Sequence, residues 1–99
     1  MFQPSTVLPS SDRPVSHEIR YERSFLLDLK NLEPAVYQRV FQFVFQDKLT
    51  LTQIQEMPGF RQIYASPIFY RFELSDCLIG VEITGQIVKF LRVIPKPDI

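Results

Sequence analysis

The sequence predicts one α+β domain in which a short N-terminal strand precedes two helices, and both helices pack on one face of an antiparallel sheet of three or four strands. Two observations indicate this class. Apolar residues recur at helical spacing through residues 23–46. Residues 68–93 form three apolar-rich runs divided by the short polar breaks at 75–76 and 84–86, which is typical of an antiparallel meander. A chain of 99 residues is long enough for a single such domain.

The first sixteen residues differ from the rest in composition. They contain three of the eight prolines and four serines, without apolar periodicity of either kind. We therefore expect a disordered arm over residues 1–16 and one folded domain over residues 17–99. The alternative for the arm is a peptide that docks on a partner in extended form. Residues 17–21, HEIRY, alternate polar and apolar side chains and predict a first or edge strand.

Two helices follow this strand. The first is predicted within RSFLLDLKNL, residues 23–32, with Ser24 as a candidate N-cap and Asn31 near its end. The second begins at Pro34, which suits a first helical turn. Its apolar stripe consists of Val36, Val40, Phe41, Val44 and Phe45. Phe43 lies off this stripe, so it is either exposed or in contact with a partner.

The second half of the chain contains the sheet. Residues 49–57 predict a short helical turn, and Pro58-Gly59 marks a turn after it. FRQIYAS, residues 60–66, is a candidate strand, and three further strands are expected near residues 68–74, 77–83 and 87–94. Two prolines in PKPDI then end the sheet.

Side-chain alternation gathers the charges of these strands on one face. The face opposite the helices is expected to carry Arg71, Glu73, Leu78, Gly80 and Glu82. Lys89 or Arg92 joins them, depending on the register of the last strand. One interpretation is a solvated face with ion pairs such as Arg71 with Glu82. The other is a concave binding site, which the absence of a side chain at Gly80 favours.

Composition narrows the function classes. Eleven basic and eleven acidic residues cancel, so no strong overall positive field attracts nucleic acid, although a local basic patch remains compatible with this balance. No apolar run is long enough to span a membrane, and no secretory signal is present, so we expect a cytoplasmic protein without a membrane partner. The single cysteine, Cys77, is expected to be buried in the sheet. We expect neither a metal nor a cofactor.

The folded part resembles the RelE/ParE superfamily of toxins from type II toxin-antitoxin systems. The resemblance rests on YERSFLLDLKNL, MPGF, FYRFELSDCLIGVEITG and IVKFLRVIPKPDI, in that order, and covers residues 21–99. It implies a RelE-like fold and an antitoxin partner that wraps the toxin with an extended segment. It also implies one of two activities, which are metal-independent cleavage of mRNA in the ribosome and inhibition of DNA gyrase.

The resemblance assigns roles residue by residue. Arg71 matches the arginine of the Tyr-Arg-Ile motif, and Lys96 is the surviving cation of the closing element, so both are candidate catalytic residues. Arg61, Arg71, Arg92 and Lys96 are the candidate RNA contacts. Glu73 stands where the family often has a basic residue, and Leu78 replaces the catalytic arginine of Asp-Tyr-Arg-Ile-Gly. His17 is expected to be solvated or structural.

These replacements keep a second hypothesis open. A RelE-fold protein that has lost catalysis would act as a protein-binding module, through helix-in-groove or strand-addition recognition. A gyrase inhibitor of the ParE type would also need no nuclease residues.

Overall fold

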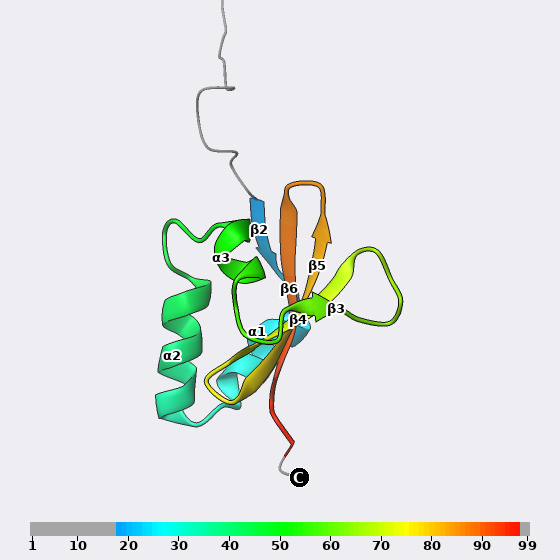
Figure 1. Ribbon diagram of the computed structural model, residues 1–99. Helices are drawn as coiled ribbons and strands as arrows, with labels where there is room; N and C mark the ends of the chain where they lie inside the picture. Colours follow the sequence, from blue (N-terminus) through cyan, green and yellow to red (C-terminus); the bar gives the residue numbers. More distant parts are fainter. Residues whose placement is uncertain (1–17, 98–99) are drawn as a thin grey trace, which may run out of the picture.

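A five-stranded sheet with helices packed against one face forms the folded part of the protein (Figure 1). The computed structural model describes residues 18–97, so the predicted arm over residues 1–16, His17 and the last two residues lie outside it. The strands are β2 (Glu18–Tyr21), β3 (Arg61–Gln62), β4 (Phe69–Leu74), β5 (Cys77–Thr84) and β6 (Ile87–Pro95). Their order across the sheet is β2-β6-β5-β4-β3.

The sheet is mixed because its N-terminal strand runs parallel to its C-terminal strand. β2 pairs with β6 from Glu18 opposite Ile87 to Tyr21 opposite Phe90, whereas all other neighbours are antiparallel. The predicted α+β class and the three-stranded meander are confirmed. The expected antiparallel sheet of three or four strands is extended, because β2 joins one edge and the two-residue β3 joins the other. Parallel pairing requires a long crossover, which a local sequence pattern does not reveal.

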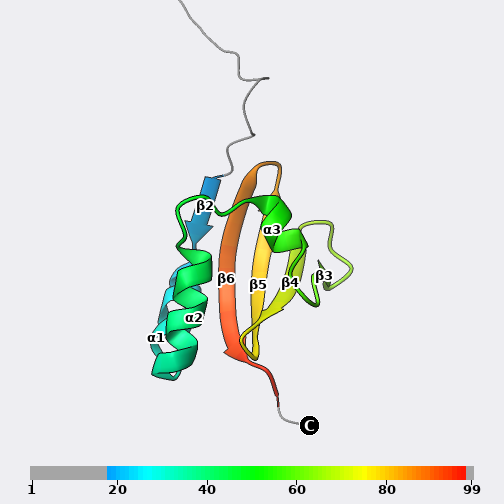
Figure 2. The same ribbon diagram turned by 60° about the vertical axis from the view of Figure 1, so that its left-hand side comes forward.

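Three helices connect the strands, namely α1 (Arg23–Lys30), α2 (Pro34–Val44) and α3 (Leu51–Gln55). Figure 2 shows α1 and α2 lying together along one side of the sheet. Thr50 caps α3 through a reciprocal capping box with Gln53. The predicted N-cap of α1 is wrong, because the helix begins after Glu22 and the Ser24 hydroxyl donates instead to the carbonyl of Leu91, at 2.7 Å. None of the helices in residues 18–97 is long and apolar enough to cross a membrane.

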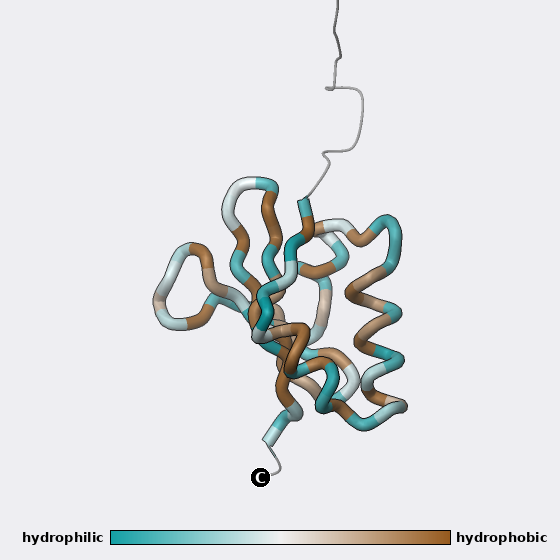
Figure 3. The backbone as a smooth tube through the Cα atoms, turned by 180° about the vertical axis from the view of Figure 1, so that it is seen from behind, coloured by the Kyte–Doolittle hydropathy of each residue, from teal (hydrophilic) through white to brown (hydrophobic). Residues whose placement is uncertain are grey.

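The core lies between the helices and the sheet. It contains Phe25 and Leu29 of α1, Val40 and Val44 of α2, and the inward-facing residues of β4, β5 and β6, which are Phe72, Cys77, Ile79, Val81, Val88, Phe90 and Val93. In β4 and β5 the buried residues alternate with the predicted open-face residues Arg71, Leu78 and Gly80, as expected, and the predicted burial of Cys77 is confirmed. Figure 3 shows the hydrophilic residues of α2 on its outer side and its apolar residues facing the sheet.

Two phenylalanines of α2 exchange their expected roles. Phe43, expected to be exposed or to contact a partner, is half-buried, with its ring 5.8 Å from the ring of Phe72. Phe41, expected on the apolar stripe, is 43% exposed. The two rings lie on opposite sides of the buried pair Val40 and Val44, each about 80° from its centre, so helical spacing alone does not decide which ring is covered. Phe43 is on the side that packs against Phe72.

A β-bulge brings both basic residues of β6 to the open face of the sheet. Gly80 pairs with Arg92 and Val81 pairs with Phe90, so Leu91 is an extra residue in β6. Phe90 and Val93 therefore both face the core. The expectation that only one of Lys89 and Arg92 lies on the open face is wrong. The bulge shifts the alternation by one residue, so both side chains lie on that face.

Candidate functional site

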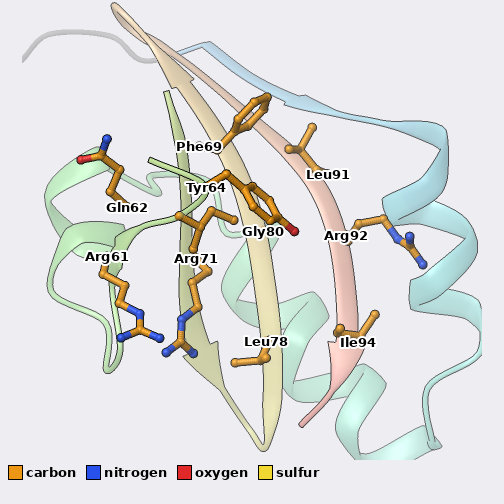
Figure 4. A pocket seen from close by; sticks show the side chains of 11 residues that line it. Arg61, Gln62, Tyr64, Phe69, Arg71, Leu78, Gly80, Leu91, Arg92 and Ile94 are labelled. Carbon is orange, nitrogen blue, oxygen red and sulfur yellow. The ribbon is translucent and has the colours of Figure 1, made fainter. Parts of the chain in front are cut away.

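A groove of about 750 Å³ crosses the open face of the sheet, on the side away from α1 and α2. Its apolar lining comes from every part of the meander and from the β3–β4 loop, and consists of Ile63, Phe69, Leu78, Leu91 and Ile94. Arg61, Gln62, Tyr64 and Arg71 line one side, Gly80 lies centrally and Arg92 stands opposite (Figure 4). The concave face expected from the missing side chain at Gly80 is therefore present.

Two arginines stand directly opposite each other at one side of the groove. Arg61 of β3 pairs in register with Arg71 of β4, and Figure 4 shows both guanidinium groups projecting in the same direction. Like charges on directly opposite strand positions destabilise a sheet. An anion between the two groups would remove that repulsion, and arginine pairs bind phosphate with good geometry.

A carboxylate bridges this pair to a third cation. Glu73 Oε2 lies 3.4 Å from Arg71 Nη1, and Glu73 Oε1 lies 3.0 Å from Lys96 Nζ. The hydrogen bond and charge of Lys96, with a smaller contribution from Arg71, hold the pKa of Glu73 below its ordinary value. We call Arg61, Arg71, Lys96 and Glu73 the cation cluster. Its three cations exceed its one carboxylate, so the cluster is positive at neutral pH.

The ion pair suggested between Arg71 and Glu82 does not form. Arg71 lies opposite Gly80, and Glu82 lies opposite Phe69, so the two charges are displaced along the strands. Arg71 contacts Glu73 on its own strand instead. In the sequence Glu73 was notable only as an acidic residue where the resembling toxins often have a basic one. Its contacts with both Arg71 and Lys96 become apparent only in the structure.

The turn at Pro58-Gly59 positions the Glu73 side chain. The amide of Glu73 donates to the carbonyl of Pro58, at 2.8 Å. Gly59 has a φ of +71°, and a Cβ at this position would lie 2.8 Å from Glu73 Oε2 and 2.9 Å from Glu73 Cγ. Only glycine combines this backbone conformation with so close an approach. The turn predicted from the Pro-Gly dipeptide therefore supports the cation cluster directly.

Arg92 is held away from the cation cluster. Its Nε donates to Asp28 Oδ2 at 2.6 Å and its Nη2 donates to Asp28 Oδ1 at 3.0 Å, while the amide of Val93 donates to the same carboxylate at 3.1 Å. The Arg92 guanidinium lowers the pKa of Asp28 chiefly through this hydrogen bonding. In Figure 4 the Arg92 side chain points toward α1. Three of the four predicted RNA contacts thus belong to one cluster, and the fourth joins β6 to α1.

Leu78 and Tyr64 complete the groove. Leu78 lies opposite Glu73 in the β4–β5 pairing and lines the groove with an apolar side chain. Tyr64 is 85% exposed and comes from the loop between β3 and β4. Tyr64 was not among the residues selected from the sequence, because FRQIYAS was expected to be a strand. Only Arg61 and Gln62 form a strand, and Tyr64 lies in the turn that follows it.

The strand order, the two packed helices and the open-face groove define a RelE/ParE fold, the fold of toxins from toxin-antitoxin systems. Solved structures that share it include the RelB-RelE antitoxin-toxin complex of Methanococcus jannaschii, with a TM-score of 0.59, 21% identity, and 77% of this chain and 88% of that chain covered. The RelBE2 toxin-antitoxin complex of Mycobacterium tuberculosis matches with a TM-score of 0.64 at 18% identity, covering 83% of this chain and 100% of that chain.

A chromosomal ParDE system from P. aeruginosa has the same fold, with a TM-score of 0.53, 13% identity, and 82% of this chain and 97% of that chain covered. The sequence itself matches no protein-family model and no curated protein significantly. At these identities the likeness concerns the fold. The expectation of a RelE/ParE-like fold drawn from the sequence is confirmed.

Proposed function

We propose that this chain is the toxin of a type II toxin-antitoxin system and that it inhibits translation by cleaving mRNA on the ribosome. The observation that carries the proposal is the cation cluster at the side of an open groove, on a fold that RelE and ParE toxins share. Phosphoryl transfer depends mostly on positioned positive charge, and Arg61, Arg71 and Lys96 supply it.

Cleavage without a metal requires a base, an acid and charge stabilisation. The RNA 2′-oxygen attacks the adjacent phosphorus, the bond from phosphorus to the 5′-oxygen breaks, and a 2′,3′-cyclic phosphate forms. The Glu73 carboxylate would accept the proton of the 2′-hydroxyl, and the Lys96 ammonium would donate one to the leaving 5′-oxygen. Arg61 and Arg71 would stabilise the charge on the other phosphate oxygens.

The ion pairs within the cluster predict that this cleavage is slow. A general base works best when its pKa is near the working pH, and the pKa of Glu73 is lowered by its two cationic partners. Leu78 adds no charge at the position where the resembling toxins have an arginine. Exchange of Leu78 for arginine would supply a further cation for the phosphate oxygens in the transition state. We expect this gain to outweigh the additional lowering of the pKa of Glu73, so that cleavage increases.

An antitoxin is the proposed partner. The cytoplasm is the proposed compartment, because it contains the ribosomes and mRNA. The solved neighbours from Methanococcus jannaschii and Mycobacterium tuberculosis are toxin-antitoxin complexes. In this chain Leu26 and Leu27 of α1 and Phe41 of α2 expose between 42% and 48% of their surface. Exposed apolar side chains of this size suit an apolar partner segment.

A second candidate function is a catalytically inactive RelE-fold binding module. The observation that favours it is the apolar lining of the groove, together with Leu78 in place of an arginine. Affinity purification from native cells distinguishes the candidates, because a translation toxin recovers ribosomes, a ParE-like inhibitor recovers gyrase, and a binding module recovers another protein without either.

Induced expression tests the toxin directly. Wild type is expected to stop growth and to produce new mRNA 5′ ends in primer extension, Arg71→Ala to lose both effects, and Leu78→Arg to strengthen them. Arg23→Ala, an exposed arginine on α1, is the matched control and should behave as wild type. Unchanged growth and intact mRNA after induction of wild type and Leu78→Arg would rule out the nuclease.

A further inference from the structure

The loop between β3 and β4 holds an exposed aromatic ring above the groove. Tyr64 and Ala65 both have left-handed backbone conformations, with φ of 58° and 50°, which are unfavourable for residues that carry a Cβ. Three contacts maintain the turn. The Ser66 amide donates to the Ile63 carbonyl at 3.1 Å, the Ile68 amide donates to Ser66 Oγ at 3.2 Å, and the Gln62 side chain donates to the Ser66 carbonyl.

The result of this strained turn is the placement of Tyr64. Its side chain is 85% exposed, so the ring does not contribute to the core. Figure 4 shows the ring projecting across β5 at the level of Gly80, and both residues line the groove. A loop that fixes an exposed tyrosine in this way provides a stacking surface.

The floor beneath the ring is flat because Gly80 has no side chain. No atom lies within 4 Å of the position that a Cβ at Gly80 would take, so the space belongs to the groove and not to the core. Leu91 and Ile94 line the groove on the β6 side of this floor. A planar, largely apolar group would contact the floor on one face and the Tyr64 ring on the other.

The chemistry beside the floor identifies the occupant. Arg61 and Arg71, on the same side of the groove as Tyr64, provide two guanidinium groups for a phosphate. A planar ring next to a phosphate describes a nucleotide, and the groove volume of about 750 Å³ lies within the range of small-molecule sites. The base must be unpaired to reach a floor of this kind, because bases within an RNA duplex are stacked on one another.

We infer that the groove binds one unpaired nucleotide of single-stranded RNA, with its phosphate between Arg61 and Arg71 and its base between the Tyr64 ring and the Gly80 floor. The inference rests on the proposed function in taking RNA as the target. It adds a base-stacking residue and a base-sized floor to the cation cluster. Stacking of this kind is tolerant of sequence, so it increases affinity for any unpaired base, with purines favoured by their larger rings.

Fluorescence anisotropy of labelled oligomers on the full-length protein tests the site. The probes are an adenosine hexaribonucleotide and a ribose-phosphate hexamer of the same charge without bases. Wild type is expected to bind the adenosine hexamer about tenfold more tightly than the abasic chain. Tyr64→Ala and Gly80→Val are each expected to remove this preference while leaving abasic binding unchanged, and Tyr64→Phe to retain it.

Two controls make the outcome specific. A Cβ at Gly80 meets no protein atom within 4 Å, and a β-branched residue suits a strand, so Gly80→Val is expected to fold, which thermal unfolding checks. Phe41→Ala removes an exposed aromatic ring outside the groove and is expected to bind both probes like wild type. Arg71→Ala is measured in the same assay. Equal wild-type affinity for the two probes, or a full base preference in Tyr64→Ala, overturns the nucleotide site. If Arg71→Ala still weakens binding in that case, the proposed function is retained. Absence of binding to either probe overturns the proposed function as well.

Discussion

The three glycines of the chain occupy three different environments, so their exchange for alanine separates backbone strain from side-chain contact. Gly59 has a positive φ, and a Cβ there would meet Glu73 at 2.8 Å. Gly85 also has a positive φ, of 58°, but has open space around it. Gly80 has open space and a backbone conformation that any residue adopts.

The expected changes in the free energy of unfolding follow from these environments. A left-handed alanine costs about 1–2 kcal/mol, offset by about 0.4–1 kcal/mol from the stiffer unfolded chain, so Gly85→Ala should cost about 1 kcal/mol. Gly59→Ala carries the same cost and also forces the neighbouring side chain off its rotamer, which adds about 1 kcal/mol. Gly80→Ala should gain about 0.5 kcal/mol, because glycine is unfavourable within a strand.

Urea unfolding followed by circular dichroism measures these free energies, and thermal unfolding gives the melting temperatures. In a domain of this size the melting temperature should fall by about 10 °C for Gly59→Ala and by about half as much for Gly85→Ala. Gly59→Ala should also weaken binding of the abasic hexamer, because Glu73 can no longer hold Arg71 and Lys96 in place. If Gly59→Ala and Gly85→Ala destabilise the protein equally, and Gly59→Ala binds the abasic hexamer like wild type, Gly59 does not position the Glu73 side chain.

Three further predictions concern the core and its charges. Phe72→Ala, at a fully buried position, should destabilise the protein by about 3–5 kcal/mol in urea unfolding. Phe41→Ala, at an exposed position, should cost less than about 1 kcal/mol. Similar costs for the two variants would contradict the assigned core. The lowered pKa of Asp28 means that this carboxylate stabilises the fold above about pH 4 and that the stabilisation is lost as the pH falls through its folded pKa. Asp28→Asn should therefore be less stable than wild type at pH 7, and its stability should depend less on acid. Parallel pH profiles of stability for the two proteins would exclude this role. Burial, with a smaller effect of Asp76, raises the pKa of the Cys77 thiol, and this residue is 2% exposed. The thiol should therefore react with a disulfide reagent only after the protein is unfolded in urea. Rapid labelling of the native protein would refute its burial.

The parts of the fold that depend on local periodicity were predictable. Alternation along β4 and β5 placed Phe72, Ile79 and Val81 on the buried face, and the structure confirms this. Pro34 marked the start of α2, and Pro58-Gly59 marked the turn before the sheet. Each of these features follows from the geometry of a few consecutive residues, which a sequence displays directly.

The features that depend on distant residues were not predictable in the same way. The extra residue at Leu91 changes the parity of β6, and no local pattern distinguishes a bulge from a continuous strand. The pair of Asp28 and Arg92 joins residues far apart in the chain. Alternation assigned Arg92 to the correct face of the sheet, but the direction of a long side chain on that face depends on which carboxylate lies nearby.

The parallel pairing of β2 with β6 has a consequence for the timing of synthesis. A ribosome that adds about 5–20 residues per second needs roughly 3 to 14 seconds to proceed from Glu18 to its partner Ile87. During that interval β2 has no strand beside it, and Phe25 and Leu29 of α1 lack the β6 surface against which they pack. The sheet is completed only when β6 has been made. A ribosome that produces this protein therefore synthesises the last strand of the sheet before the first strand has a partner.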